Sequence, residues 1–307
     1  MSIKAEVVCH SEAPNGEQLL TLELEFHRFI LAEINTHRVL SRNYQSSRAV
    51  PVEKMIKQVT ENPAIPVHWG KNQRGMVAEE SCSRDIDLCN YYGGEWENSV
   101  GPEECWKIAA RQAAMLAEEF SESGYHKQIV NRLLEPFIWT KGVITATLDG
   151  WNSVLELRLH KDAQPEFRAL AVLIKGAIDN SKPTKLDYGD WHLPYVEWSR
   201  DSEGQYFVDD NITTIEEAIK VSCSSCGQIS YRALDTSLEK AIKIYDMLNL
   251  PEGGVFKDDP PHFSPAEHVA VVVDDVHHEE IYTGNFVSST FEQYRKLLEY
   301  GIEGAYI

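Results

Sequence analysis

The segment from Thr36 to Pro51, THRVLSRNYQSSRAVP, gathers side chains that bind anions. No Asp or Glu occurs between Ile34 and Val52, and the segment holds fixed cations and neutral donors: Arg38, Arg42, Arg48, Ser41, Asn43, Ser46 and Ser47. A guanidinium group can grip two phosphate oxygens at once. The pattern predicts an anion pocket at a helix end, suited to a nucleotide or phosphorylated cofactor. The alternative is a surface loop whose arginines pair with carboxylates elsewhere.

The rest of the chain has the opposite charge. Its 307 residues include 48 Asp plus Glu against 29 Lys plus Arg, a formal net charge of -19, and 43% are hydrophobic. This composition is typical of a globular protein with one large domain or two smaller ones. So negative a chain repels a phosphate backbone, which argues against a nucleic-acid polymer as partner and leaves small anions possible.

Membrane and disulfide signals are weak. The uncharged run Gly142 to Leu148 is far too short to cross a bilayer, and the start MSIKAEVVCH lacks the apolar core of a signal peptide. Six cysteines in a chain of this length are too few for a disulfide framework. We therefore expect a cytoplasmic protein with reduced thiols and no membrane partner.

Hydrophobic periodicity predicts the elements around the arginine segment, which is our name for residues 36–51. Alternation in LLTLELEF predicts a strand, a helix is expected from about Arg28 to Arg38, and Pro51 opens another helix. Between the two helices we expect a loop. Residues 62–101 lack clean periodicity and predict a long irregular excursion, and a core helix follows from Pro102 to Gly124.

Further elements are predicted downstream. A short helix ends at Pro136, FIWTKGVITATL is β-prone, and WNSVLELRLH and QPEFRALAVLIKGAID indicate two helices. Acidic, turn-like residues from 199 to 210 mark a plausible boundary. The tail predicts helices at about 214–221 and 236–249, a strand in HVAVVVDD, and a last helix from about 286 to 300.

The arginine segment resembles the signature of the flavin-dependent thymidylate synthases, Arg-His-Arg-x-x-Ser-x-Asn-Glu-x-Ser-x-Arg. Six positions match in register: His37, Arg38, Ser41, Asn43, Ser46 and Arg48. Two depart, because Thr36 stands in place of the first arginine and Tyr44 in place of the glutamate.

Downstream segments continue the resemblance. VNRLLEP is similar to a segment with a nucleotide-binding arginine, here Arg132, and LELRLHKDAQPEFRAL is similar to the helix that carries the family's key arginine, here Arg158. An asparagine that helps to hold the flavin is replaced by Ser153, with Asn152 beside it.

A third block occurs out of order. Residues of about 219–274 resemble the family's N-terminal run, and His268 corresponds to a histidine that contacts flavin. This order suggests a circular permutation or a rearranged relative. We expect a core at 1–200 with a long inserted loop at 62–101, and a C-terminal part at 201–307 that resembles the family's N-terminal block.

The resemblance implies a fold and a reaction. The fold is α+β, with an antiparallel or mixed sheet flanked by helices and sites between the subunits of a homotetramer. The family methylates carbon 5 of dUMP to give dTMP, with methylenetetrahydrofolate as carbon donor and NADPH as reductant through FAD. Carbon 5 is activated without a cysteine adduct, by stabilising the N3-deprotonated pyrimidine.

The resemblance also implies residue roles. Arg158 is the catalytic cation beside the pyrimidine, and its alternative role is a helix arginine paired with an acidic neighbour (Glu156, Asp162 or Glu166). Substrate contacts fall to Glu33, Thr36, Ser46, Ser47, Arg48 and Arg132. Glu33 replaces a glutamine and puts its own contact in doubt. Flavin contacts fall to His37, Arg38, Ser41, Asn43, Tyr44, Ser153 and His268.

Other readings stay open. Cys223-x-x-Cys226 could be a zinc or redox pair, but no second pair at ligand spacing accompanies it, so no metal is expected. His277 and His278 lie among acidic residues, as in a solvated hairpin. The departures at Glu33, Thr36 and Tyr44 make a hydroxymethylating or dCMP-directed relative a second hypothesis, and a non-catalytic nucleotide-binding or flavin-binding oligomer a third.

Overall fold

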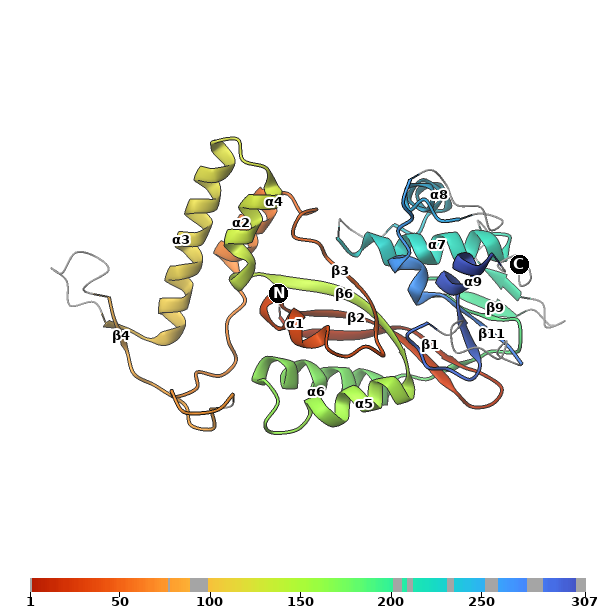
Figure 1. The fold of residues 1–307 in the computed structure, drawn as a ribbon, viewed down its shortest axis with the longest axis horizontal. Helices are drawn as coiled ribbons and strands as arrows, with labels where there is room; N and C mark the ends of the chain where they lie inside the picture. The colour runs from red at the N-terminus through yellow and green to blue at the C-terminus, as the bar shows by residue number, and fades with distance from the viewer. Residues whose placement is uncertain are drawn as a thin grey trace.

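The computed structural model describes residues 2–76, 78–88, 99–200, 206–208, 212–230, 235–251, 259–274 and 284–301. A five-stranded sheet of order β3-β6-β2-β1-β7 forms its centre (Figure 1). The strands are β1 (Lys4–Glu12), β2 (Gln18–His27), β3 (Ser41–Tyr44), β6 (Trp139–Thr147) and β7 (Thr184–Lys185). All neighbours are antiparallel except β1 and β7, which are parallel. The predicted α+β class with a mixed sheet flanked by helices is confirmed.

β6 is an inner strand of the sheet, paired on both of its edges. It pairs with β2 from Leu19–Thr147 to His27–Trp139, and with β3 from Ser41–Thr145 to Tyr44–Gly142. Val, Ile and Thr dominate its sequence, and almost all of it is buried. β1 and β2 form a hairpin whose turn includes Gly16 at φ +87°, a left-handed conformation that glycine adopts without strain.

Two helices cover one face of this sheet, α5 (Leu148–Arg158) and α6 (Pro165–Asn180). The Thr147 side chain caps α5 by accepting from Gly150 N at 3.1 Å. Apolar side chains of β2, β6, α5 and α6 fill the interface, and Trp151 at its centre donates to Leu20 O at 3.2 Å. The α5 helix is thereby fixed against β2, which sets the position of Arg158 at the end of α5.

A helical arm extends from one end of the sheet (Figure 1). It comprises α2 (Val52–Glu61), α3 (Pro102–Glu122), α4 (Lys127–Val130) and the 3-10 helix η2 (Asn131–Phe137), around their own apolar cluster. Pro102 starts α3 at a position where a missing N–H costs nothing. The two-stranded pair β4 (Ile86–Asp87) and β5 (Ser99–Val100) precedes α3.

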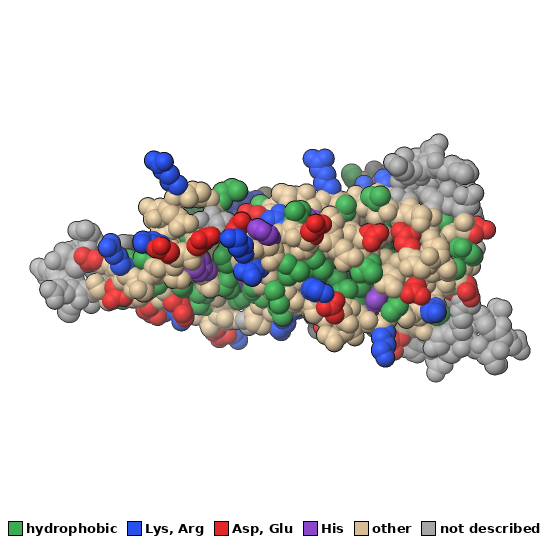
Figure 2. Space-filling model, turned by 90° about the horizontal axis from the view of Figure 1, so that it is seen from below, with side chains coloured by type: hydrophobic (Ala, Val, Ile, Leu, Met, Phe, Trp, Pro, Cys, Tyr) green, Lys and Arg blue, Asp and Glu red, His purple; other side chains and the backbone are tan. Residues whose placement is uncertain are grey.

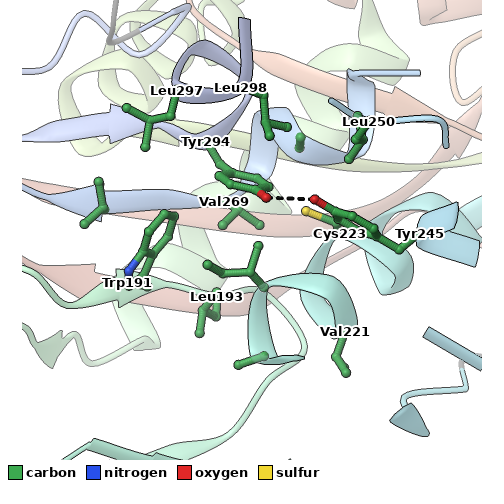
Figure 3. Packing of buried hydrophobic residues seen from close by; sticks show 14 of the residues in the cluster. Trp191, Leu193, Val221, Cys223, Tyr245, Leu250, Val269, Tyr294, Leu297 and Leu298 are labelled. Atoms are coloured by element: carbon green, nitrogen blue, oxygen red, sulfur yellow. Dashed lines mark hydrogen bonds between the residues drawn. The ribbon is translucent and has the colours of Figure 1, made fainter. Parts of the chain in front are cut away.

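The opposite face and end of the sheet carry a second set of elements, here called the C-terminal layer. Its sheet has the order β12-β11-β8, formed by Phe291–Gln293, Ala270–Val272 and Trp191–His192. Its helices are α7 (Ile215–Gly227), η3 (Gln228–Ser230), α8 (Leu238–Met247), η4 (Ser264–His268) and α9 (Tyr294–Tyr300). Figure 3 shows its core, where the hydroxyls of Tyr245 and Tyr294 are hydrogen-bonded at 2.7 Å. Strands β9 (Trp198–Arg200) and β10 (Tyr206–Val208) pair beside it.

Several boundaries differ from the sequence predictions. The helix expected at 28–38 is only η1 (Arg28–Ile30) and α1 (Leu31–Ile34), and the expected loop after it contains β3. β3 forms because β6 has an open edge whose backbone groups need partners. The last helix begins at Tyr294, since β12 occupies the preceding residues.

The described part of the irregular excursion is anchored at its start. Indole N–H groups of Trp106 and Trp139 donate to the carbonyls of Ala64 and Asn62, at 2.9 and 3.1 Å. The start of the excursion therefore lies against aromatic residues of α3 and β6. Tyr91, Tyr92, Trp96 and Cys89 lie outside the described residues, as do His277 and His278.

The C-terminal layer begins before residue 201, because β8 pairs with β11 through Trp191–Val271 and His192–Ala270. The division into 1–200 and 201–307 stays a prediction. No helix among the residues described here is long and apolar enough to cross a membrane.

We predict that Gly142→Ala destabilises the fold and that Gly176→Ala does not. A Cβ at Gly142 would lie 2.6 Å from Tyr44 Cδ1, between two paired strands, so the ring must move; we expect a loss of about 1–3 kcal/mol. A Cβ at Gly176, inside α6, meets nothing within 4 Å, and Ala there should stabilise by about 0.5–1 kcal/mol. Urea unfolding midpoints test both. Equal midpoints for the two variants would contradict the prediction.

Candidate functional site

β3 divides the arginine segment into two groups. Thr36, His37 and Arg38 precede the strand, and Ser46, Ser47 and Arg48 follow it. Four strand residues span roughly 13 Å, so the two groups lie at opposite ends of β3.

The first arginine group is Thr36, His37 and Arg38 with Arg158, which α5 brings to them. Arg158 Nε donates to His37 Nε2 at 2.8 Å, and Nη2 donates to Thr36 Oγ1 at 3.4 Å. The Arg158 guanidinium also lies 4.6 Å from the centre of the Phe167 ring. Arg38 is exposed. The arginine motif and the helix arginine, 121 residues apart at the His37 contact, are therefore in direct contact.

The alternative role for Arg158 does not describe its contacts. Glu166 accepts from Val67 N at 2.9 Å, and Asp162 lies beside His160. In the described part of the chain, Arg158 forms no ion pair with Glu156, Asp162 or Glu166. Its charge is not neutralised by a carboxylate and stays available to an anionic ligand.

His37 is held in its neutral form. Burial, which is the largest cause, and the positive charges of Arg158 and Arg42 together lower its pKa from 6.5 to about 4. Arg42 also donates to the His37 carbonyl at 3.1 Å. A neutral Nε2 can accept from the guanidinium, so His37 orients Arg158 without adding charge.

The second arginine group is Ser47, Arg48, Arg132 and Arg28. The Ser47 hydroxyl donates to Glu135 Oε1 at 2.9 Å, and Asn131 Nδ2 donates to Ser47 O at 2.6 Å. Arg48 and Arg132 follow directly on these hydrogen-bonded residues, and both are exposed.

Arg28 adds a further cation to the second group. Its Nη2 lies 4.0 Å from Glu135, and burial together with the charge of Arg132 lowers the pKa of its guanidinium. Glu135 is the carboxylate beside Arg28, and Arg132 is close enough to influence Arg28 electrostatically. The excess positive charge suits a phosphate.

β3 itself is tied to the C-terminal layer. Gln293 Nε2 donates to Ser41 Oγ at 2.9 Å, and Asn43 Nδ2 donates to Cys226 O at 2.7 Å. Tyr44 packs edge-on against Phe26 with ring centres 6.0 Å apart, and burial raises the pKa of its hydroxyl. In this chain these three motif residues make structural contacts, and their predicted flavin contacts stay predictions.

The remaining predicted residues include one pair in contact, Thr36 and Glu33. Thr36 Oγ1 donates to Glu33 O at 2.7 Å, and Ser46 O accepts from Ala49 N at 2.9 Å. Ser153 is exposed on α5, on a different face from Arg158 because five residues turn a helix by about 140°.

His268 belongs to η4 and is fully buried. Its Nδ1 is 2.9 Å from Thr145 Oγ1, and its Nε2 has no hydrogen-bond partner among the residues that the structure describes. Burial lowers its pKa from 6.5 to about 3. His268 is therefore neutral and lies beneath the surface of this chain.

Sequence reasoning missed several residues of the site. Arg28 and Glu135 gave no motif signal, and Phe167 looked like an ordinary core residue of α6. His192, which lies in the same buried network as His268, also gave no motif signal. Cys223 and Cys226 are buried on α7, and burial raises the pKa of both thiols.

The fold and the two arginine groups define an α+β protein with a candidate anion site at each end of β3. Residues 16–184 match the family model of the thymidylate synthase complementing protein, Thy1. This is more than half of the chain, so the chain belongs to that family, the flavin-dependent thymidylate synthases, which are enzymes. The matched range contains β3, both arginine groups and α5, and ends before β8.

Solved structures give a weaker likeness. Two structures of thymidylate synthase X from Helicobacter pylori, each with FAD and dUMP, match with a TM-score of 0.33 and 17% identity. The match covers 52% of this chain and 67% of each of those chains. No curated protein is significantly similar to the chain.

We predict that removing the charge of Arg158 raises the pKa of His37. Arg158→Met deletes the nearer of the two cations that oppose protonation, so the pKa should move from about 4 toward 6.5. NMR titration of the His37 ring measures it. Arg168→Met, which removes an exposed cation from α6, is the matched control and should leave the His37 titration unchanged. A His37 pKa that stays the same in both variants would refute the contact.

Proposed function

We propose that this chain methylates carbon 5 of dUMP to give dTMP, with methylenetetrahydrofolate as carbon donor and reduced FAD as hydride source. The observation that supports it most is the contact of Arg158 with Thr36 and His37. A guanidinium that forms no ion pair among the described residues is held by a neutral histidine of the motif that carries the family resemblance.

Arg158 is the proposed catalytic residue. Carbon 5 of uracil is a poor nucleophile until negative charge builds on the ring, and a fixed cation beside N3 or O2 stabilises that charge. Arg158 donates its Nε–H to His37, so the remaining guanidinium N–H groups can face the pyrimidine. Because His37 is neutral, it does not compete for the developing charge.

The second arginine group is the proposed seat of the substrate phosphate. Arg48 and Arg132 supply two exposed guanidinium groups, and Ser46 and the backbone near Ser47 supply neutral donors. Two forked cations favour a dianionic group, while Glu135 accepts from Ser47 and lies 4.0 Å from Arg28.

FAD is the proposed cofactor, and the chain offers polar groups that fit it. His37 and exposed Arg38 would face its phosphates or ring edge, and His268 carries a buried nitrogen without a partner among the described residues. Ser41, Asn43, Tyr44 and Ser153 would complete the flavin side. When bound, FAD supplies the redox chemistry and NADPH reduces it, while the protein binds and orients the ring.

The site is proposed to form between subunits of a cytoplasmic homotetramer. The two arginine groups lie at opposite ends of β3, so a neighbouring subunit would bring complementary groups together. Figure 2 shows apolar side chains gathered along the face that carries α5 and α6. Three of the residues on these helices are unusually exposed: Leu157 at 60%, Val172 at 54% and Leu173 at 41%. Such a patch on a negatively charged protein suits a subunit interface.

The order of the blocks supports a rearranged member of the family. The Thy1 match ends at residue 184, whereas the block at 219–274 that resembles the family's N-terminal run follows it. We propose a circular permutation, with a core at 1–200, the excursion at 62–101 and a C-terminal part at 201–307.

A second candidate function is hydroxymethylation of a pyrimidine nucleotide, or methylation of dCMP. One of the departures from the family pattern, Thr36, lies within 3.4 Å of the proposed catalytic arginine. Thr36 places a hydroxyl where the family has an arginine, so the groups that would face the pyrimidine ring of the substrate differ. A non-catalytic binding oligomer is the third possibility.

Tritium release from carbon 5 separates these functions. With methylenetetrahydrofolate and reduced flavin present, we expect release from labelled dUMP and little from dCMP, and analysis of the product distinguishes methyl from hydroxymethyl. Release from dCMP alone would favour the second candidate. No release from either nucleotide, despite a yellow flavin spectrum of the purified protein, would favour the third.

We predict that Arg158→Ala abolishes turnover while the protein keeps its flavin. Losing one preorganised charge at the reacting group typically costs about 10²–10³ in rate, and FAD has other contacts. Tritium release and the visible spectrum measure the two effects. Arg168→Ala, the matched exposed arginine on α6, should retain full turnover. Unchanged turnover in Arg158→Ala would overturn the catalytic assignment.

A further inference from the structure

A row of small polar side chains crosses the sheet on the face opposite α5 and α6. Ser41, Thr145, Thr21 and Cys9 are directly paired across β3, β6, β2 and β1. The C-terminal layer covers this polar row and places two histidines on it. Both histidines and both threonines are fully buried: His192, His268, Thr21 and Thr145.

These four residues form one chain of hydrogen bonds. His268 Nδ1 lies 2.9 Å from Thr145 Oγ1, which lies 2.6 Å from Thr21 Oγ1. Thr21 Oγ1 lies 2.8 Å from His192 Nε2. At the far end, His192 Nδ1 lies 2.8 Å from Ser11 Oγ, and Ser11 is itself only 2% exposed.

The number of hydroxyl protons limits the directions in which these hydrogen bonds can run. A neutral imidazole has one N–H and one lone pair, and each hydroxyl has one proton. Two oxygens 2.6 Å apart require a proton between them. If Thr21 donates to Thr145, then Thr145 donates to His268 Nδ1, and Thr21 accepts from His192 Nε2. Both histidines then carry their proton on Nε2.

The reverse order gives the other permitted state. If Thr145 donates to Thr21, then Thr21 donates to His192 Nε2, and Thr145 accepts from His268 Nδ1. Both histidines then carry their proton on Nδ1. Opposite tautomers would leave either two oxygens in close contact without a proton or a buried hydroxyl proton without an acceptor, and both arrangements are unfavourable.

Both rings are neutral at physiological pH, as this argument requires. Burial lowers the pKa of His192 and of His268 from 6.5 to about 3. Burial is the largest cause for His192, and its electrostatic interactions with His10 and His268 act in the same direction. His10 meets Ser181 and Gln18 on the other side of β1.

We propose that Thr21 and Thr145 couple the tautomers of His192 and His268, so that His192 is a positioning residue for His268. The shared tautomer decides whether Nε2 of His268, which is buried and has no partner among the described residues, carries an N–H or a lone pair. This catalytic meaning rests on the proposed function, in which His268 contacts the flavin, whereas the coupling itself does not. His192 lies outside the residues 16–184 that match the family.

Solid-state ¹⁵N NMR of protein labelled at the histidine ring nitrogens tests the coupling directly. His192→Gln and His268→Gln assign the two rings by loss of their signals. At pH 7 we expect both rings to be neutral and to carry the proton on the same nitrogen. Opposite tautomers, or an imidazolium at either position, would overturn the proposal.

Three threonine variants of β6 test the path. Thr145→Val removes the hydroxyl that links the rings, and we expect the tautomer of His268 to stop following that of His192. Thr145→Ser keeps the hydroxyl, so both rings should keep the shared tautomer of the wild-type protein. This expectation for the serine variant stands even if Thr145→Val does not fold. Thr140→Val is the control, because Thr140 is a buried threonine of β6 that lies outside the hydrogen-bond network of the two histidines. It should leave the tautomers of both rings unchanged. A shared tautomer that persists in Thr145→Val would also refute the coupling.

The labelled protein needs no ligand for these measurements. Failure of the proposed function, seen as no tritium release and no flavin binding, would leave the shared tautomer in place. If the two tautomers proved to be uncoupled, the protein would still bind flavin and turn over its substrate. The two results are therefore distinguishable.

Discussion

Pairing of β6 on both edges is the constraint on which the rest of the structure depends. β2 and β3 take its backbone hydrogen bonds, which leaves one side-chain face for each of two layers. The apolar face receives α5 and α6, and the polar face receives the C-terminal layer. Because a strand alternates its side chains, one sequence serves both faces. Every site residue is positioned relative to this strand.

The two faces organise the site differently. On the apolar side, packing of Trp151 and Phe167 fixes α5, so that its last residue, Arg158, reaches His37. On the polar side, Ser41 and Asn43 bind the C-terminal layer and hold β3 in place. The arginine segment is thus an edge strand whose two ends present cations while its middle is structural. This division explains why a single motif combines arginines with small polar residues.

The charge distribution follows the same plan. The chain is strongly acidic overall, yet residues 35–51, which include β3, hold three arginines and no Asp or Glu. A small anion is therefore attracted to this segment and repelled elsewhere. Burial keeps His37, His192 and His268 neutral, so the imidazoles orient neighbours by hydrogen bonds and add no charge of their own.

Local sequence determined the α+β class, the strand at β2, the helices α3, α5 and α6, and the choice of Arg158 and the arginine segment as the chemical centre. Periodicity and motif spacing are properties of adjacent residues, so they can be read without a fold. Only the tertiary structure decided that β3 pairs with β6, that Arg158 meets His37, and that His192 and His268 share a hydrogen-bonded chain. Those contacts join residues more than 70 positions apart, and their geometry depends on strand register and helix packing, which no short segment encodes.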